Sequence, residues 1–266
     1  MHFYYFCPLS AKAPTIKYTM KKTTLLLLIL AIAFTVNAQS EKDPKKTTKK
    51  IDLGNRASDH FVLQYGADIW PNTPDSLSTK GFSRHFNAYI MLDKPFKTNP
   101  KLSVAYGVGI GSSNMFFDKR YVNIKANATK LPFSRSVSGT DSSYFKKFKV
   151  TTIFLEAPIE LRFYSNPENP SKSWKGAIGV KVGTLIKAFT KGKDLQTKNG
   201  QSLYGSTYIA KESDKKYFNT TRLAATFRIG YGAFSLDAGY QITQVLKEGS
   251  GPEVRPFSIG LTVSGL

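Results

Sequence analysis

The chain has 266 residues, with 38 lysines and arginines against 18 acidic residues, so its formal net charge is +20. Its one cysteine, Cys7, excludes a framework of internal disulfide bonds. A basic balance of this size can indicate nucleic-acid binding, but the N-terminal region predicts export from the cell, where anionic lipid headgroups are the partner we expect instead.

The N-terminal region has the layout of a secretory signal peptide. Met20 is followed by two lysines, an apolar run of about a dozen residues and a small-residue site that ends at Ala38. A membrane helix needs roughly 20 apolar residues, so this run is too short to be one. We therefore predict a signal peptide at 20–38, cleaved after Ala38, and interpret 1–19 as an upstream extension of the reading frame. Cleavage removes four lysines and no acid, which lowers the net charge to +16.

The next segment, 39–57, is polar and rich in lysine, which is typical of a flexible tail. Apolar and polar residues alternate from about residue 58 to the end of the chain. Because side chains alternate across a strand, this period of two predicts β-structure. We expect a flexible periplasmic tail followed by one β domain at 58–266.

The alternation is clearest at 150–163, where one face is continuously apolar and the other carries three charges. Segments with similar alternation occur at 60–70, 81–93, 102–116, 174–189, 218–229, 234–245 and 256–266. Each is close to the roughly ten residues that a tilted membrane strand requires. The pattern favours an all-β, eight-stranded antiparallel transmembrane barrel with the apolar face toward lipid. A soluble β-sandwich or a lipocalin-like binder is the alternative.

The connections between these segments alternate in length, which also favours a barrel. The connections at 118–147 and 190–217 are long, polar and rich in lysine, whereas those at 94–101, 165–173 and 230–233 are short. Outer-membrane barrels have long external loops and short periplasmic turns. We expect the two long loops to be structureless and external. Aromatic residues are expected to form lipid-facing girdles at both ends, and those at the end with the long loops are Trp70, Phe116, Phe117, Phe189 and Phe218.

The polar face of the strands predicts a charge network in the lumen. An eight-stranded barrel is just wide enough for side chains to fill it, and buried charges are tolerated when they are paired. We expect glycines on the same face to leave room for the long arginines. The predicted network consists of Glu156, Glu160, Arg162, Lys181, Arg222, Arg228 and Asp237. Structural filling of the lumen is the simplest interpretation, and a small gated channel or ligand site is an alternative.

The sequence offers little for catalysis or for a metal. His85 and Ser83 share one face of a predicted strand, so an enzyme at the barrel rim that modifies lipids would have to use them, because His60 falls at the other end. A histidine and a serine two residues apart more commonly form ordinary hydrogen bonds. The histidines and acids lack metal-ligand spacing, and we expect no metal, no cofactor and no enzymatic activity.

The segment FLEAPIELRF at 154–163, followed by GAIGVKVG at 176–183 and closed by FSIGLTV at 257–263, resembles the small outer-membrane barrel family of Bacteroidota, which includes PorT-like proteins. The resemblance implies a porin-like outer-membrane β-barrel domain in a Gram-negative cell envelope. We expect a structural or interaction role, with outer-membrane lipid and lipopolysaccharide phosphates meeting the basic loops and with envelope proteins as further partners. The alternative that the resemblance implies is a PorT-like accessory of type IX protein secretion, with secretion proteins as its partners.

Overall fold

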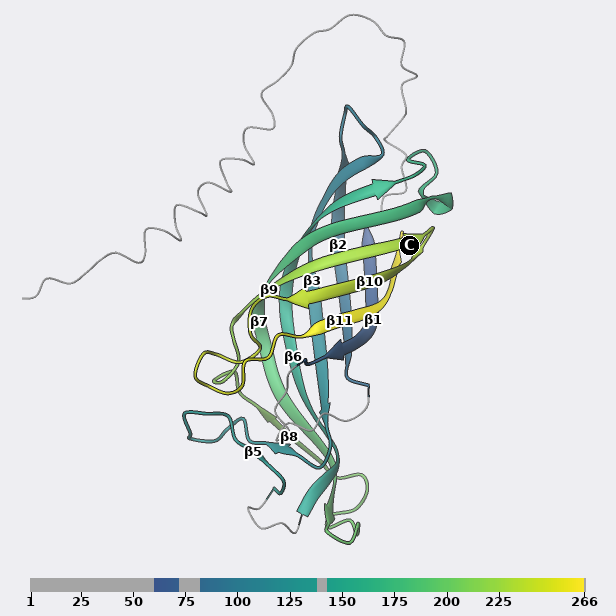
Figure 1. The fold of residues 1–266 in the computed structure, drawn as a ribbon. Coiled ribbons are helices and arrows are strands. Elements are labelled where there is room, and N and C mark those ends of the chain that lie inside the picture. The colour runs from purple at the N-terminus through teal and green to yellow at the C-terminus, as the bar shows by residue number, and fades with distance from the viewer. Residues whose placement is uncertain (1–59, 72–81, 138–142, 266) are drawn as a thin grey trace, which may run out of the picture. The chain divides into compact units, whose positions relative to one another are not determined.

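The computed structural model describes residues 60–71, 82–137 and 143–265. Within these residues, nine strands form one antiparallel sheet, and eight of them close into a ring (Figure 1). The order around the ring is β6-β3-β2-β1-β11-β10-β9-β7, and β7 pairs back with β6. The predicted all-β barrel with eight antiparallel strands is therefore confirmed. No described residue belongs to a helix that is long and apolar enough to cross a membrane.

The strands of the ring match the segments with alternating polarity. Their bounds are β1 (Phe61–Ile69), β2 (Arg84–Pro95), β3 (Leu102–Phe117), β6 (Ser143–Tyr164), β7 (Trp174–Thr197), β9 (Thr221–Tyr231), β10 (Phe234–Gln241) and β11 (Phe257–Ser264). The remaining elements are the short pair β4 (Tyr121–Val122) and β5 (Phe133–Ser134), the 3-10 turn η2 (Pro170–Lys172), and β8 (Ile209–Ser213), which pairs with the outer part of β7.

The outside of the ring is apolar and the inside is polar. On β6, Leu155 and Ile159 are 43% and 53% exposed, whereas the intervening Glu156 is 1% exposed. Large apolar side chains are exposed in the same way on the other strands of the ring. A soluble protein does not expose an apolar surface of this extent. The arrangement is instead that of a barrel whose outer surface is solvated by lipid.

The two long connections contain more β-structure than the sequence predicts. The strand β6 begins at Ser143 instead of Val150, and β7 continues to Thr197 instead of ending at Phe189. The expectation that 118–147 and 190–217 are structureless is therefore wrong. Cross-strand hydrogen bonds between β6 and β7 continue beyond the apolar band because alternation persists there, with lysines in place of the outward apolar residues.

An apolar cluster fills the interior at the end with the long connections, which we call the long-loop end. It includes Phe117 and Phe218, which are 3% and 1% exposed, and Trp70 packs against it. The prediction that these aromatic residues face lipid is therefore wrong. Between the buried charged residues and the long-loop end, the inner face of the strands changes from polar to apolar. Alternation alone does not reveal this change, because it separates inward from outward residues but does not show where the inward ones become apolar.

Candidate functional site

The seven residues predicted for the lumen network all lie on the inner faces of ring strands. Six of them are buried and Lys181 is half-buried. Hydrogen bonds and ion pairs gather them around Glu156, around Glu160 and, in the case of Asp237, beside His85.

The Glu156 cluster joins four strands across the lumen. Arg222 Nη1 donates to Glu156 Oε1 over 3.0 Å, and Lys181 Nζ lies 3.4 Å from Oε2. The Tyr89 hydroxyl donates to the same Oε2 over 2.5 Å. The Arg222 guanidinium also lies over the Phe154 ring, 3.9 Å from its centroid. One carboxylate thus holds two cations and a phenol in place, on β6, β7, β9 and β2.

The Glu160 cluster lies four residues closer to the short turns, on the same face of β6. Arg162 Nε and Arg228 Nη2 each donate to Glu160 Oε2 over 2.9 Å. Arg162 Nη1 also lies 4.0 Å from Asp93, whose side chain is 1% exposed. Two arginines therefore meet two carboxylates in this layer, which is the pairing that buried charge requires.

Glycines on the neighbouring strands make room for the glutamates. Gly109 on β3 and Gly183 on β7 lie directly opposite Glu156, and Gly179 lies opposite Glu160. A Cβ atom added at Gly111 would lie 2.5 Å from Glu156 Oε2. The atoms nearest to a Cβ added at Gly111, Gly179 or Gly183 include those of Glu156 or Glu160 and none of an arginine, so these glycines adjoin the glutamates and not the arginines that were expected there.

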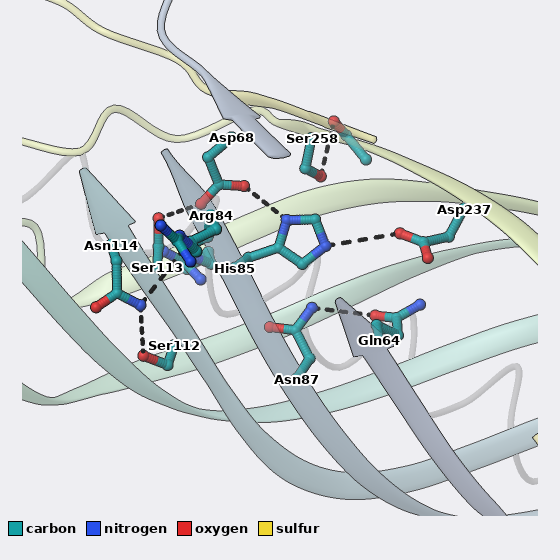
Figure 2. Close-up of polar contacts among 12 residues, drawn as sticks. Gln64, Asp68, Arg84, His85, Asn87, Ser112, Ser113, Asn114, Asp237 and Ser258 are labelled. Carbon is teal, nitrogen blue, oxygen red and sulfur yellow. Dashed lines mark hydrogen bonds and ion pairs between the residues drawn. The ribbon is translucent and has the colours of Figure 1, made fainter. Parts of the chain in front are cut away.

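The third group, which we call the His85 cluster, consists of His85, Asp68 and Asp237. His85 Nδ1 lies 2.9 Å from Asp68 Oδ1, and Nε2 lies 3.8 Å from Asp237 Oδ2 (Figure 2). The Thr262 hydroxyl donates to Asp237 over 2.7 Å, and the Ser113 hydroxyl donates to Asp68. The sequence places His85, Asp68 and Asp237 on inner faces but does not predict that they meet, because their contact depends on the register of β1, β2 and β10.

The geometry around His85 differs from that of a nucleophilic site. In a catalytic triad the imidazole lies between the serine and the carboxylate. Here Asp68 lies between Ser113 and His85, and the Ser83 hydroxyl accepts a hydrogen bond from the Phe116 backbone N–H over 3.1 Å. His60 Nδ1 lies 2.9 Å from the Met91 carbonyl, near the start of β1. Within the described residues, no group of three or more histidines, cysteines or acids is placed to hold a metal ion.

The free space within the lumen is small. A cavity of about 40 Å³ lies beside the His85 cluster and is also lined by Lys181 and Arg222. A second cavity, of about 20 Å³, lies between Asp237 and Glu160. One water needs roughly 10 to 15 Å³ measured in this way, so the first space holds about three waters, the second holds about one, and neither fits an organic ligand.

Replacing His85 with alanine should lower stability without changing any lipid. The variant leaves the Asp68 and Asp237 carboxylates in the lumen without their shared partner, and a hydrogen bond to a charged group contributes about 1.5 to 3 kcal/mol. Urea unfolding in detergent micelles should therefore show a loss of about 2 kcal/mol. The same strain's lipid profile should match that of the parent. If the variant assembles normally but the cells lose a lipid modification, the protein is an enzyme at the barrel rim.

Comparison with known proteins places these features in a family. The family model described as "Outer membrane protein beta-barrel domain" matches residues 37–244. Among solved structures, the chain is similar to Ail, the attachment invasion locus protein of Yersinia pestis, at 13% sequence identity and a TM-score of 0.31. The match covers 77% of this chain and 94% of that chain. No curated protein matches the sequence.

Proposed function

The chain belongs to the outer membrane protein β-barrel domain family, and from this membership we propose that it is a non-enzymatic barrel, closed to solutes, with a structural or interaction role in the cell envelope. The family implies the outer membrane as its location. The exposed apolar band around the ring is the surface that such a location requires.

The observation that carries this proposal is the way Glu156 joins strands across the lumen. Its carboxylate contacts side chains from β2, β7 and β9, so an ion passing at this level would have to displace paired charges. The Glu160 cluster repeats this arrangement nearer the short turns. Together with cavities of about 40 Å³ or less in this region, the clusters favour a packed interior over a pore.

Conductance in a planar lipid bilayer tests whether the lumen is closed. We expect the purified full chain to insert without stepwise currents at moderate voltage, because the ion pairs leave no continuous aqueous path. The control is the same sample after boiling, which reports contaminating pores. If the unboiled protein gives reproducible unitary currents and the boiled sample gives none, the lumen is open, and the alternative of a small gated channel is favoured.

Gentle extraction tests the alternative of a secretion accessory, which the resemblance to PorT-like proteins implies. After crosslinking in cells and extraction in a mild detergent, we expect envelope proteins unrelated to secretion, or none, to be recovered with the chain. Stoichiometric recovery of type IX secretion components, together with a secretion defect in a deletion strain, would favour the accessory role.

The export signal predicted at 20–38 lies outside the described residues, as do the upstream extension at 1–19 and the tail at 39–57. We expect the protein in isolated outer membranes to begin at Gln39, because the small-residue site ends at Ala38. Intact-mass spectrometry measures this directly. A mass that still includes Met20 would contradict the predicted cleavage.

A further inference from the structure

Five lysines form one outward-facing patch at the long-loop end of the barrel. We call them the lysine ladder: Lys147, Lys149, Lys191, Lys193 and Lys211. Lys149 on β6 lies directly opposite Lys191 on β7, and Lys191 lies directly opposite Lys211 on β8. Lys147 and Lys193 form the next outward row. Their side chains share one face because the residues between them, such as Phe148 and Gly192, are buried on the other face.

The basic residues expected in flexible external loops are thus partly in regular strands. Strand pairing fixes the ladder backbones at neighbouring positions on a rigid sheet. A flexible loop would have to be ordered before it could present its charges together, whereas the ladder presents them without that entropic cost.

The ladder has no acidic partner among the described residues. The carboxylates nearest in sequence are engaged elsewhere, since Asp194 is buried and lies 3.9 Å from Lys146, and Glu212 accepts hydrogen bonds from the Tyr121 hydroxyl over 3.3 Å. The contacts of the ladder are instead neutral. Lys149 Nζ donates to Asn114 Oδ1 over 2.7 Å, and Lys211 lies 4.5 Å from the centroid of the Phe189 ring.

Placing like charges directly opposite each other on adjacent strands is destabilising. The ladder does this in two successive rows. Arg84 adds a further cation beside it, with its guanidinium 5.3 Å from the centroid of the Phe116 ring that Lys149 also covers. A protein fold gains nothing from this arrangement alone, so the repulsion points to an anion supplied from outside the chain.

The level of the ladder identifies the kind of anion. On β7 the exposed apolar residues continue up to Ile186, and Lys191 follows five residues later, roughly 16 Å along the tilted strand. The headgroup layer lies directly above the hydrocarbon core. The aromatic rings of Phe116 and Phe189 lie among the same cations, which is typical of a membrane interface.

An apolar groove lies on β3, β6, β7 and β9, farther from the long-loop end than the ladder, and it shares β6 and β7 with the ladder. It has a volume of about 410 Å³ and is lined by outward residues that include Val108, Leu155 and Val182. A ligand that carries phosphate at one end and a hydrocarbon chain at the other matches both features. Inorganic phosphate or a soluble acidic peptide would use only the ladder.

We propose that the lysine ladder binds the phosphate groups of an outer-leaflet lipid whose acyl chain lies in the groove below it. This proposal rests on the proposed function, because it requires the barrel to be embedded in the outer membrane. The bound lipid would neutralise Lys149, Lys191 and Lys211 together and would relieve the repulsion between β6, β7 and β8.

The test compares two triple variants of the full chain in nonionic detergent micelles. One carries Lys149→Gln, Lys191→Gln and Lys211→Gln. The control carries Lys198→Gln, Lys215→Gln and Lys247→Gln, which remove the same charge from exposed positions outside the ladder. The probes are phosphorylated lipid A, its chemically dephosphorylated form and inorganic phosphate. Native mass spectrometry measures the binding of each probe. If the ladder triple does not fold, the single variant Lys191→Gln takes its place in the comparison.

We expect the parent and the control triple to bind phosphorylated lipid A equally. The ladder triple should bind it on the order of a hundredfold more weakly, since each lysine near an anionic lipid surface contributes roughly a factor of five. The single variant should bind it about fivefold more weakly. Without lipid, the ladder triple should be at least as stable as the parent, because the repulsion is removed.

Three results would overturn the proposal. In the first, the ladder triple binds phosphorylated lipid A as tightly as the parent does. In the second, the parent binds dephosphorylated lipid A as tightly as the phosphorylated form, and in the third, inorganic phosphate saturates the site at the same concentration as the lipid. A parent chain that fails to form a heat-modifiable barrel in outer membranes would instead contradict the proposed function. The two failures are therefore distinguishable.

Discussion

The Glu156→Gln variant should lose about 3 to 5 kcal/mol of unfolding free energy, because removing one partner of a buried ion pair leaves uncompensated charge. Glutamine keeps the size of the side chain but not its charge. Lys181 and Arg222 would then face each other in the lumen with no anion between them. Their positive charges come from β7 and β9, so the repulsion acts between two adjacent strands of the ring.

Equilibrium unfolding in urea, followed by the fluorescence of Trp70 and Trp174 in micelles, measures this loss. The matched control is Glu253→Gln, because Glu253 is exposed and its substitution should change the unfolding free energy by less than about 0.5 kcal/mol. If both variants unfold at the same urea concentration as the parent, Glu156 is not holding the strands together. The proposal of a charge-packed lumen would then lose its main support.

The Gly111→Ala variant should lose about 1 to 3 kcal/mol, which is the usual cost of overpacking a well-filled interior. The added Cβ would lie 2.5 Å from Glu156 Oε2 and 2.9 Å from Oε1. The carboxylate would therefore have to move away from Lys181 or Arg222, and the ion pairs would weaken. The change is one methyl group, so no gain or loss of charge complicates its interpretation.

Gly176→Ala is the matched control for this substitution. A Cβ at Gly176 would have no neighbour within 4 Å, and replacing glycine by alanine at a compatible position stabilises a protein by about 0.4 to 1 kcal/mol. A double-mutant cycle adds a second check. In a Glu156→Ala background the Gly111→Ala substitution should cost much less, because the group it displaces is absent. An unchanged cost in that background would assign the effect to the backbone.

The barrel could be predicted from the sequence because its main signal is local. Alternation along 150–163 separates an apolar face from a charged face without any knowledge of neighbouring strands. The alternating lengths of the connections then favour a barrel with its long loops at one end and its short turns at the other. Both features depend on residues close together in the chain, and the structure confirms the resulting fold class.

The contacts within the lumen could not be predicted in the same way. His85 meets Asp68 and Asp237 because β1 pairs with both β2 and β11, and β11 pairs with β10. Alternation gives the inward face of each residue but not its height relative to the next strand, which depends on register. The grouping of the predicted charges around Glu156, around Glu160 and beside His85 follows from these heights.

The outer parts of β6 and β7 were missed for another reason. The lysine ladder resembles a solvated loop in composition, because its outward residues are charged. The inward residues between them, such as Phe148, still alternate and pack in the apolar cluster at the long-loop end. Charge content suggested a loop, whereas the period of the apolar residues indicated a strand, and the period was the better guide.

Electrophoretic mobility of the protein from isolated outer membranes, with and without boiling, tests the central claim most directly. A closed barrel that spans the outer membrane should migrate at a different apparent mass when it is not boiled and should collapse to one band on heating. A protein that shows no shift and is recovered in the soluble periplasm would contradict the account, and its apolar outer face would then have to be buried by another protein.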